Sequence, residues 1–145
     1  MEIEQRPPLH SLAIRVTRGS SNNLLQVATL VRAATALEVA VDVLFEDAAL
    51  CKLRKDQINV MDWSPIYKRV SAELAERLLR AEFNDLESFL QGAKEHGDHV
   101  RFWASSTTIV SEDLNLGRMV ACLDAEIAPE TFVGRAVKAD AFVVF

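Results

Sequence analysis

The chain has 145 residues, a net charge of −5 and a pI near 5.2. Its 50% hydrophobic and 26% charged content is typical of one globular domain. The acidic balance argues against broad nucleic-acid binding, which needs a basic face. No window holds the ~18 uncharged apolar residues that a membrane span requires. The start, Met1–Pro8, lacks the basic and apolar regions of a signal peptide, so we expect a cytoplasmic protein.

The chain holds two cysteines, Cys51 and Cys122, and three histidines. Thiols in a cytoplasmic protein are usually reduced, and these two do not form a CxxC pair. No histidine lies near either cysteine in the sequence, so we expect no zinc site. Nothing in the sequence indicates a cofactor.

The first elements form a strand, a turn and a helix. An extended lead-in over residues 1–10 precedes a single domain over 11–145. The apolar, β-branched run 12–17 predicts a buried strand, and the polar cluster 18–23 predicts a turn. Apolar residues at helical spacing then predict a largely buried helix over 21–37.

Ser21 or Asn22 is expected to cap this helix, because its side-chain oxygen can accept an orphan backbone N–H. The nearly continuous apolar segment 39–45 is typical of a parallel strand covered on both faces. A short helix over 48–55 should follow it.

Residues 56–64 show no clear period and are expected to be irregular. Ser64 followed by Pro65 is a common helix start. A second start, of the capping-box type, occurs at residues 84–87, and the apolar pattern ends at Gly97. We therefore expect two helices in this region.

The C-terminal part again alternates apolar strands with helical segments. The last helix should begin at Pro129 and bury Phe132, Val133, Ala136 and Val137. The expected elements are a strand at 99–104, a hydroxyl-rich turn at 105–108, a short helix from Ser111 to about 119, a strand at 120–123, a helix at 129–139 and a strand at 141–145. Five strands joined by helices predict a three-layer α/β/α sandwich with a mostly parallel five-stranded sheet.

The turn after the first strand is the first candidate site, because ligands of open α/β sheets bind at the carboxyl ends of strands. Arg18, Gly19, Ser20 and Ser21 could bind a small anion or a nucleotide through backbone N–H groups and the guanidinium. The alternative is an ordinary capped turn. The turn also resembles the phosphate loop of flavodoxins, but nothing later supplies the aromatic residues that flank a flavin.

The hydroxyl-rich segment after the third strand should lie at the same sheet edge. Ser105 and Ser106 could line a pocket with the first turn, or could belong to a plain turn. A serine nucleophile needs a base in reach. There is no GxSxG motif, and His96 and His99 precede the strand, so a hydrolase is not expected.

Cys51 is the third candidate. Lys52, Arg54 and Lys55 nearby could lower its pKa and make it reactive. Alternatively it is a small core residue between two leucines, and Cys122 in the fourth strand should also be core. The ends of the strands lack the acidic residues and lysine of a receiver domain.

Met61, Trp63 and Tyr67 precede or begin the central helices. Methionine and aromatic residues favour interfaces, so this stretch could be a subunit contact or could fold onto its own core.

The order of these elements resembles the DsrE/DsrF-like family of small sulfur-relay proteins over nearly the whole chain. The matching pieces are Thr17-Arg18-Gly19, Phe45 before a short helix, and Asp113, Leu114 and Gly117 in the segment FWASSTTIVSEDLNLGRMV. The terminal Ala-Asp-Ala-Phe-Val-Val-Phe is also similar. The resemblance implies a homo-oligomer, a trimer or a hexamer, and a sulfur-relay protein as partner.

The chain departs from the family at the reactive position. In sulfur-carrying members a cysteine follows the alanine of the third strand and holds a persulfide, whereas here Ser105 follows Ala104. A hydroxyl cannot replace a thiolate in this chemistry. We therefore expect an accessory, non-catalytic member, with Cys51 as a substitute carrier and the anion-binding module as alternatives.

Overall fold

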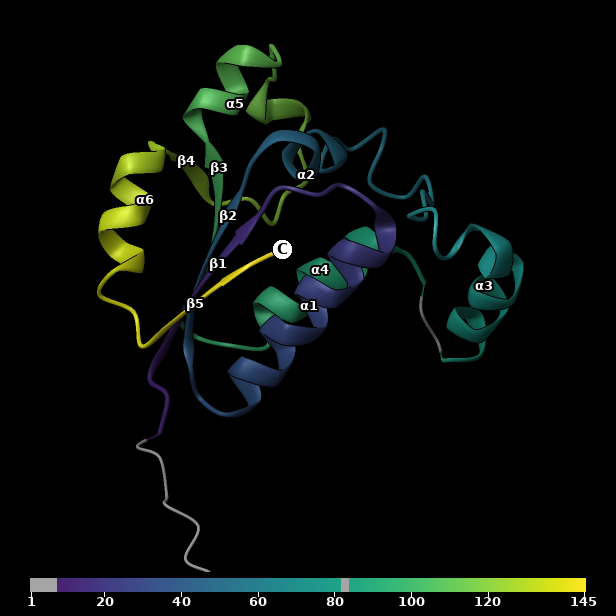
Figure 1. The fold of residues 1–145 in the computed structure, drawn as a ribbon, viewed down its shortest axis with the longest axis horizontal. Helices are drawn as coiled ribbons and strands as arrows, with labels where there is room; N and C mark the ends of the chain where they lie inside the picture. The colour runs from purple at the N-terminus through teal and green to yellow at the C-terminus, as the bar shows by residue number, and fades with distance from the viewer. Residues whose placement is uncertain (1–7, 82–83) are drawn as a thin grey trace, which may run out of the picture.

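The computed structural model describes residues 8–81 and 84–145, which form a three-layer α/β/α fold around a five-stranded parallel sheet (Figure 1). The strand order is β4-β3-β2-β1-β5, so β4 and β5 are the two edges. This confirms the predicted fold class. The strands are β1 (Ser11–Val16), β2 (Ala40–Phe45), β3 (Val100–Ser105), β4 (Ala125–Ile127) and β5 (Ala141–Val144).

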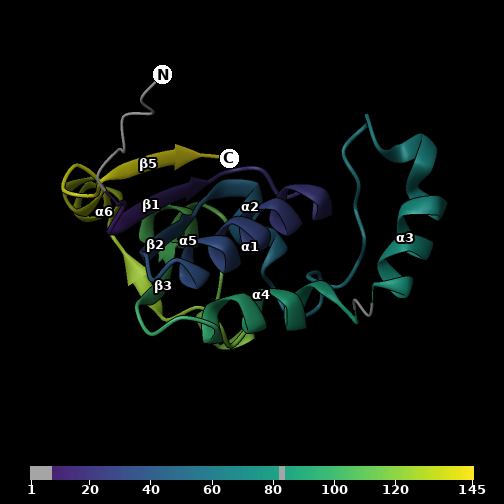
Figure 2. The ribbon, with the colours of Figure 1, turned by 90° about the horizontal axis from the view of Figure 1, so that it is seen from below.

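The helices cover the two faces of the sheet unequally (Figure 2). The first face packs against α1, α2 and α4, whereas of the described helices α6 covers the second face. The α5 helix extends from the carboxyl end of β3, beyond the sheet (Figure 1). The helices are α1 (Ser21–Ala36), α2 (Asp47–Lys52), α3 (Ser71–Arg80), α4 (Leu86–Glu95), α5 (Ser106–Ser111) and α6 (Pro129–Ala136), with 3-10 turns η1 (Lys68–Val70) and η2 (Leu116–Arg118).

The main core lies between the sheet and the α1–α4 pair. Phe45 of β2 and Phe102 of β3 are fully buried there, with ring centroids 5.4 Å apart in an edge-to-face arrangement. Alternate strand residues point to this face because side chains of a strand alternate between its two sides. Burial of such large aromatic rings stabilises the packing of the sheet against these helices.

The second face is held by a polar cluster around Asp42. Arg135 of α6 donates two hydrogen bonds of 3.0 Å to this carboxylate, and the Trp103 indole donates one of 2.8 Å. The guanidinium also lies over the Trp103 ring, 5.6 Å from its centroid. These contacts fix α6 over the middle of the sheet and leave the β5 side of this face less covered.

Several predicted boundaries were wrong near α1 and before α3. Ser20, not Ser21 or Asn22, is the N-cap of α1, and its side chain accepts from the Asn23 N–H at 3.4 Å. The helix predicted from Pro65 begins only at Ser71, because i+3 hydrogen bonds such as Tyr67 N–H to Ser64 O first form turns. The two-helix interpretation of this region is confirmed.

The prediction also failed after β3. The hydroxyl-rich segment begins the helix α5 and is not a turn, and residues 112–115 between α5 and η2 are irregular. Residues 120–123 are not a strand: β4 lies at Ala125–Ile127. Val120 and Cys122 are nevertheless buried in the main core, so their apolar character indicated burial but not a strand.

In α6, Phe132 and Ala136 are buried as expected, whereas Val133 and Val137 are exposed. An eight-residue helix on an otherwise open face can bury only one narrow stripe.

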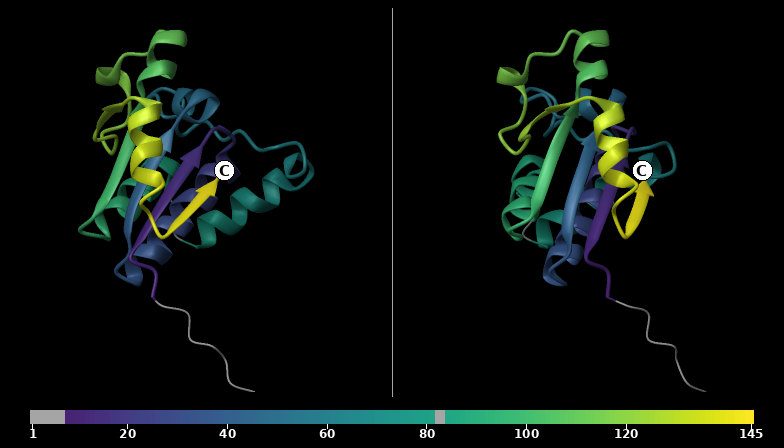
Figure 3. Two further views of the ribbon diagram at one scale, coloured as in Figure 1. Left: turned by 60° about the vertical axis from the view of Figure 1, so that its left-hand side comes forward. Right: turned by 90° about the vertical axis from the view of Figure 1, so that its left-hand side faces the viewer.

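The α3 helix stands away from the rest of the domain (Figures 2 and 3). Met61 is exposed, and Trp63 and Tyr67 are half-buried, in the segment that leads to it. Of the expected lead-in 1–10, residues 1–7 lie outside the described part, and residues 8–10 are exposed. Within residues 8–81 and 84–145, no helix is both long and apolar enough to cross a membrane.

Candidate functional site

The carboxyl ends of β1, β2 and β3 meet at one edge of the sheet, as the sequence predicted (Figure 1). Backbone hydrogen bonds join the segments that leave these strands: Ala49 N–H to Thr17 O at 3.1 Å and Glu46 N–H to Val16 O at 2.9 Å. The Thr108 hydroxyl accepts from the Asp47 N–H at 3.0 Å. Three candidate segments are thus neighbours in space.

The start of α1 is covered by the chain's own loop at residues 62–64. The Ser21 N–H donates to the Asp62 carbonyl at 2.6 Å, and the Ser21 hydroxyl accepts from the Asp62 N–H at 2.7 Å. Asn22 accepts from the Ser64 N–H at 2.9 Å. Ser21 is fully buried, so the polar groups expected to bind an anion at this residue instead hold the loop.

Gly19 is required by packing. A Cβ atom built on it would lie 2.4 Å from the Ala48 carbonyl oxygen, a distance that real contacts do not show. The glycine therefore lets β1 leave the sheet directly against the start of α2. The neighbouring Arg18 is exposed and has no ion pair within the described residues.

Cys51 lies on a surface hollow of about 500 Å³ that Gly19 and Ser20 also line. The structure thus brings Cys51 next to the first turn. Ser105 and Ser106 are not among the described residues that line this hollow. Two of the three candidate segments therefore line this hollow, and Ser105 and Ser106 do not.

The environment of Cys51 keeps its thiol protonated. Burial raises its pKa, and the Glu112 carboxylate, which accepts a hydrogen bond from the thiol, raises it further. Arg54 acts in the opposite direction and is outweighed. The expectation that nearby basic residues lower the pKa of Cys51 was therefore wrong.

Lys52, one of those basic residues, is buried and directs its ammonium group to the Val60 carbonyl. Burial lowers the pKa of Lys52, and Asp62 partly opposes this shift. The Lys52 side chain thus holds the loop after α2, and its positive charge does not act on the Cys51 thiol. Cys122 is a core residue as predicted, and burial raises its pKa to about 12.

Ser105 is the last residue of β3 and is 1% exposed. Its hydroxyl is the one buried side-chain polar atom of the described residues without a hydrogen-bond partner. It precedes α5 as the N-cap but makes no capping hydrogen bond there. Ser106 is half-buried. The segment predicted as a hydroxyl-rich turn thus begins a helix, and the Ser105 hydroxyl at its start is buried.

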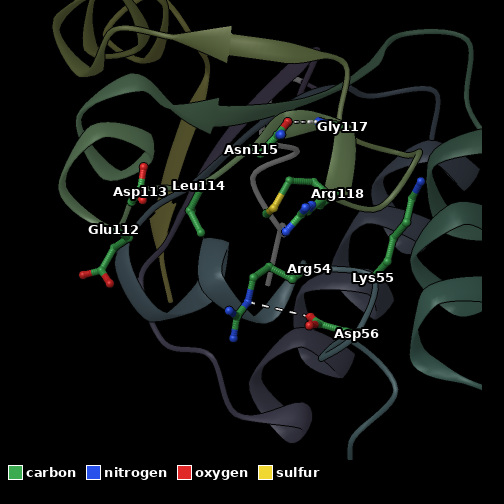
Figure 4. A pocket seen from close by; sticks show the side chains of 10 residues that line it. Arg54, Lys55, Asp56, Glu112, Asp113, Leu114, Asn115, Gly117 and Arg118 are labelled. Carbon is green, nitrogen blue, oxygen red and sulfur yellow. Dashed lines mark hydrogen bonds and ion pairs between the residues drawn. The ribbon is translucent and has the colours of Figure 1, made fainter.

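A second hollow, of about 380 Å³, lies where the end of α2 meets the segment before β4 (Figure 4). Lys55 N–H donates to the Arg118 carbonyl at 3.0 Å, and Arg54 and Met119 form an antiparallel bridge. In Figure 4 the Arg118 side chain lies between those of Leu114 and Lys55, and Arg54 turns toward Asp56. Three basic side chains (Arg54, Lys55, Arg118) and three acidic ones (Asp56, Glu112, Asp113) line it.

Sequence reasoning missed this hollow because it assigned residues 111–119 to a helix. Asp113 has a φ of +50°, and Asn115 accepts from the Gly117 N–H at 2.9 Å, so the chain turns twice within five residues. The sequence Asp-Leu-Asn-Leu-Gly carried the signal, because Asp, Asn and Gly favour turns. The balanced charges give the hollow no net preference for an anion.

No group of three or more His, Cys, Asp or Glu side chains that could hold a metal ion occurs in the described part of the chain. Cys51 and Cys122 are both free thiols.

Comparisons with known proteins give a fold and no activity. No protein-family model matches the chain, and no curated protein matches it. Among solved structures, it is similar to MTH1491 from Methanobacterium thermoautotrophicum, described as a protein of unknown function. The TM-score is 0.58 at 15% sequence identity, and the match covers 94% of this chain and 99% of that one. At this identity the likeness shows that the two chains share the fold.

Proposed function

We propose that the chain is an accessory, non-catalytic member of a DsrE-like system for intracellular sulfur trafficking. The observation that carries this proposal is Ser105. It ends β3, where the sulfur-carrying proteins that the sequence resembles have their cysteine, and its hydroxyl is buried without a partner. A hydroxyl does not form a persulfide, because sulfur relay needs a polarisable thiolate.

The state of Cys51 favours this proposal over a sulfur carrier. Its thiol is next to Glu112 and has a raised pKa, so little thiolate is present near neutral pH. The hydrogen bonds from the α1 start to residues 62–64 likewise weigh against an anion-binding module at Arg18–Asn23.

Intact-mass spectrometry after incubation with polysulfide tests whether the chain carries sulfur. We expect the mass of the wild-type chain to stay unchanged, and that of a Cys51→Ser variant as well. A gain of one sulfur atom that is abolished by dithiothreitol and by Cys51→Ser would show that Cys51 is a carrier, contrary to the proposal.

The accessory role also requires a partner that does carry sulfur. The tagged chain is purified from its own cells after protein persulfides have been labelled. It should retain a cysteine protein that bears the label. A preparation without any labelled partner would count against the role.

We further propose that the chain is a homo-oligomer, a trimer or a hexamer. Light scattering after size exclusion measures the number of chains directly.

A further inference from the structure

The edge strand β5 has backbone groups that face away from the sheet. Phe145 N–H donates to Arg15 O at 2.7 Å, and Thr17 N–H donates to Phe145 O at 2.9 Å, so Phe145 uses both its groups toward β1. In a parallel pair such residues alternate along the strand. The register, with Arg15 beside Val144, therefore turns the N–H and C=O of Phe142 and Val144 outward.

The side chains of the same two residues are also exposed. Phe142 is 47% and Val144 56% exposed, on the face of the sheet that α6 covers among the described helices. The Phe142 ring lies beside Phe132 of α6, with a centroid distance of 6.4 Å. Figure 3 shows β5 at the free edge of the sheet beside α6.

The opposite edge is protected, and β5 is not. β4 has a charged residue, Glu126, at its centre, and Asp124 and Pro129 flank it. Charges and prolines on edge strands prevent pairing with other chains. The span Ala141–Val144 contains neither, and except for Ala141 it consists of residues that favour strands. Asp140 precedes β5, but its carboxylate is turned toward β1, where it accepts from the His10 and Ser11 N–H groups.

We propose that β5 pairs with β5 of a second copy of this chain, antiparallel and across a two-fold axis at Val143. In this register Phe142 lies opposite Val144 of the second copy, and the reverse pair is identical. All outward N–H and C=O groups of these residues find partners, as in the hydrogen-bonded pairs of antiparallel strands. Each Phe side chain then packs on a valine across the strands, a favourable pair.

Two copies of β5 thus match each other in backbone hydrogen bonds and in side-chain pairs, so a second copy of this chain fits this edge. The result is a continuous sheet through two subunits. Isologous pairing gives an even number of chains. Of the trimer and the hexamer proposed above, only the hexamer agrees with this pairing; a simple dimer also agrees with it. The pairing does not depend on the sulfur-related role.

Charged variants of β5 test the pairing by light scattering after size exclusion. The wild type should contain an even number of chains. The double variant Phe142→Lys/Val144→Lys should have half that mass, because like charges then face each other. Phe142→Glu/Val144→Glu should behave the same, and an equimolar mixture of the two variants should restore the wild-type mass. The control Val110→Lys, on the exposed side of α5, should keep that mass.

Amide hydrogen exchange by NMR supplies a measurement on the unmodified chain. The amides of Phe142 and Val144 should be protected in the wild type, and they should lose protection on dilution. A monomeric or odd-numbered wild type, fast exchange at these two amides, or a Lys/Glu mixture that stays at half mass would each overturn the proposal. An edge that binds an extended peptide of another protein would leave the wild type monomeric, which is the first of these results.

Discussion

Two hydroxyls near the end of β3 differ in their hydrogen bonding. Thr108 accepts from the Asp47 N–H and helps to join α5 to the start of α2. Ser105, three residues earlier, is buried with an unpaired oxygen. A buried polar atom without a partner costs free energy, whereas a paired one does not, so the two side chains should respond oppositely to truncation.

We expect Ser105→Ala to leave the free energy of unfolding unchanged or to raise it by up to about 1 kcal/mol, because the orphaned hydroxyl is removed. Thr108→Val should lower it by about 1 kcal/mol, because the Asp47 N–H loses its acceptor. Urea unfolding of the two variants measures both effects. A clear loss of stability in Ser105→Ala would mean that the hydroxyl has a partner, such as a bound water.

The thiol of Cys51 should react slowly with iodoacetamide at neutral pH, because burial and Glu112 raise its pKa. Glu112→Gln removes the negative charge and should increase the rate several-fold at pH 7, with the pH–rate profile shifted to lower pH. Asp113→Asn is the matched control, since it removes a neighbouring charge that does not act on Cys51 and suits the positive φ there. Equal rates for the wild type and Glu112→Gln would contradict this assignment.

At the scale of elements, the contact between the β1 turn and α2 depends on a missing side chain. Gly19→Ala places a Cβ atom against the Ala48 carbonyl, and backbone must move to relieve it. We expect the free energy of unfolding to fall by about 2 kcal/mol. Gly92→Ala, in α4 with open space around it, should raise stability by roughly 0.5–1 kcal/mol. Chemical denaturation of Gly19→Ala and Gly92→Ala measures the two changes in the free energy of unfolding. Opposite signs would show that Gly19 is required by packing, beyond the usual effect of replacing glycine by alanine.

At the scale of the whole molecule, Asp140 joins the first strand to the last. Its carboxylate accepts from the His10 N–H at 2.8 Å and the Ser11 N–H at 3.1 Å, and the Ser11 hydroxyl accepts from the Asp140 N–H at 3.0 Å. Hydrogen bonds from these backbone groups lower the pKa of Asp140. The start of β5 is therefore fixed to β1 by a group that titrates in acid.

A lowered folded-state pKa means that Asp140 stabilises the fold at pH values above the ordinary aspartate pKa of about 4. This stabilisation is lost as the pH falls from there through the folded-state pKa. The melting temperature of Asp140→Ala should lie below that of the wild type at pH 7, and the difference should shrink below about pH 4. Asp98→Ala, at an exposed aspartate that forms no ion pair among the described residues, is the matched control.

The sequence by itself determined the fold class and most of the sheet. Apolar, β-branched runs and the turns between them placed β1, β2, β3 and β5 within a residue or two. The local pattern of β1, β2 and β3 matches their burial, and the edge strand β5 was found from its apolar, β-branched run. It also placed Gly19, Cys51 and Ser105 at one edge, since parallel strands end on the same side.

Only the tertiary structure decided what these residues do. Val120 and Cys122 are buried in the main core without being part of a strand, and an apolar pattern in the sequence cannot distinguish these two cases. The pKa of Cys51 is raised by burial and by Glu112, 61 positions away, and these effects outweigh the lowering by Arg54 beside it in the sequence. Likewise the loop at residues 62–64, not a ligand, meets the start of α1. Such contacts arise when the whole sheet brings distant segments together, so no local pattern contains them.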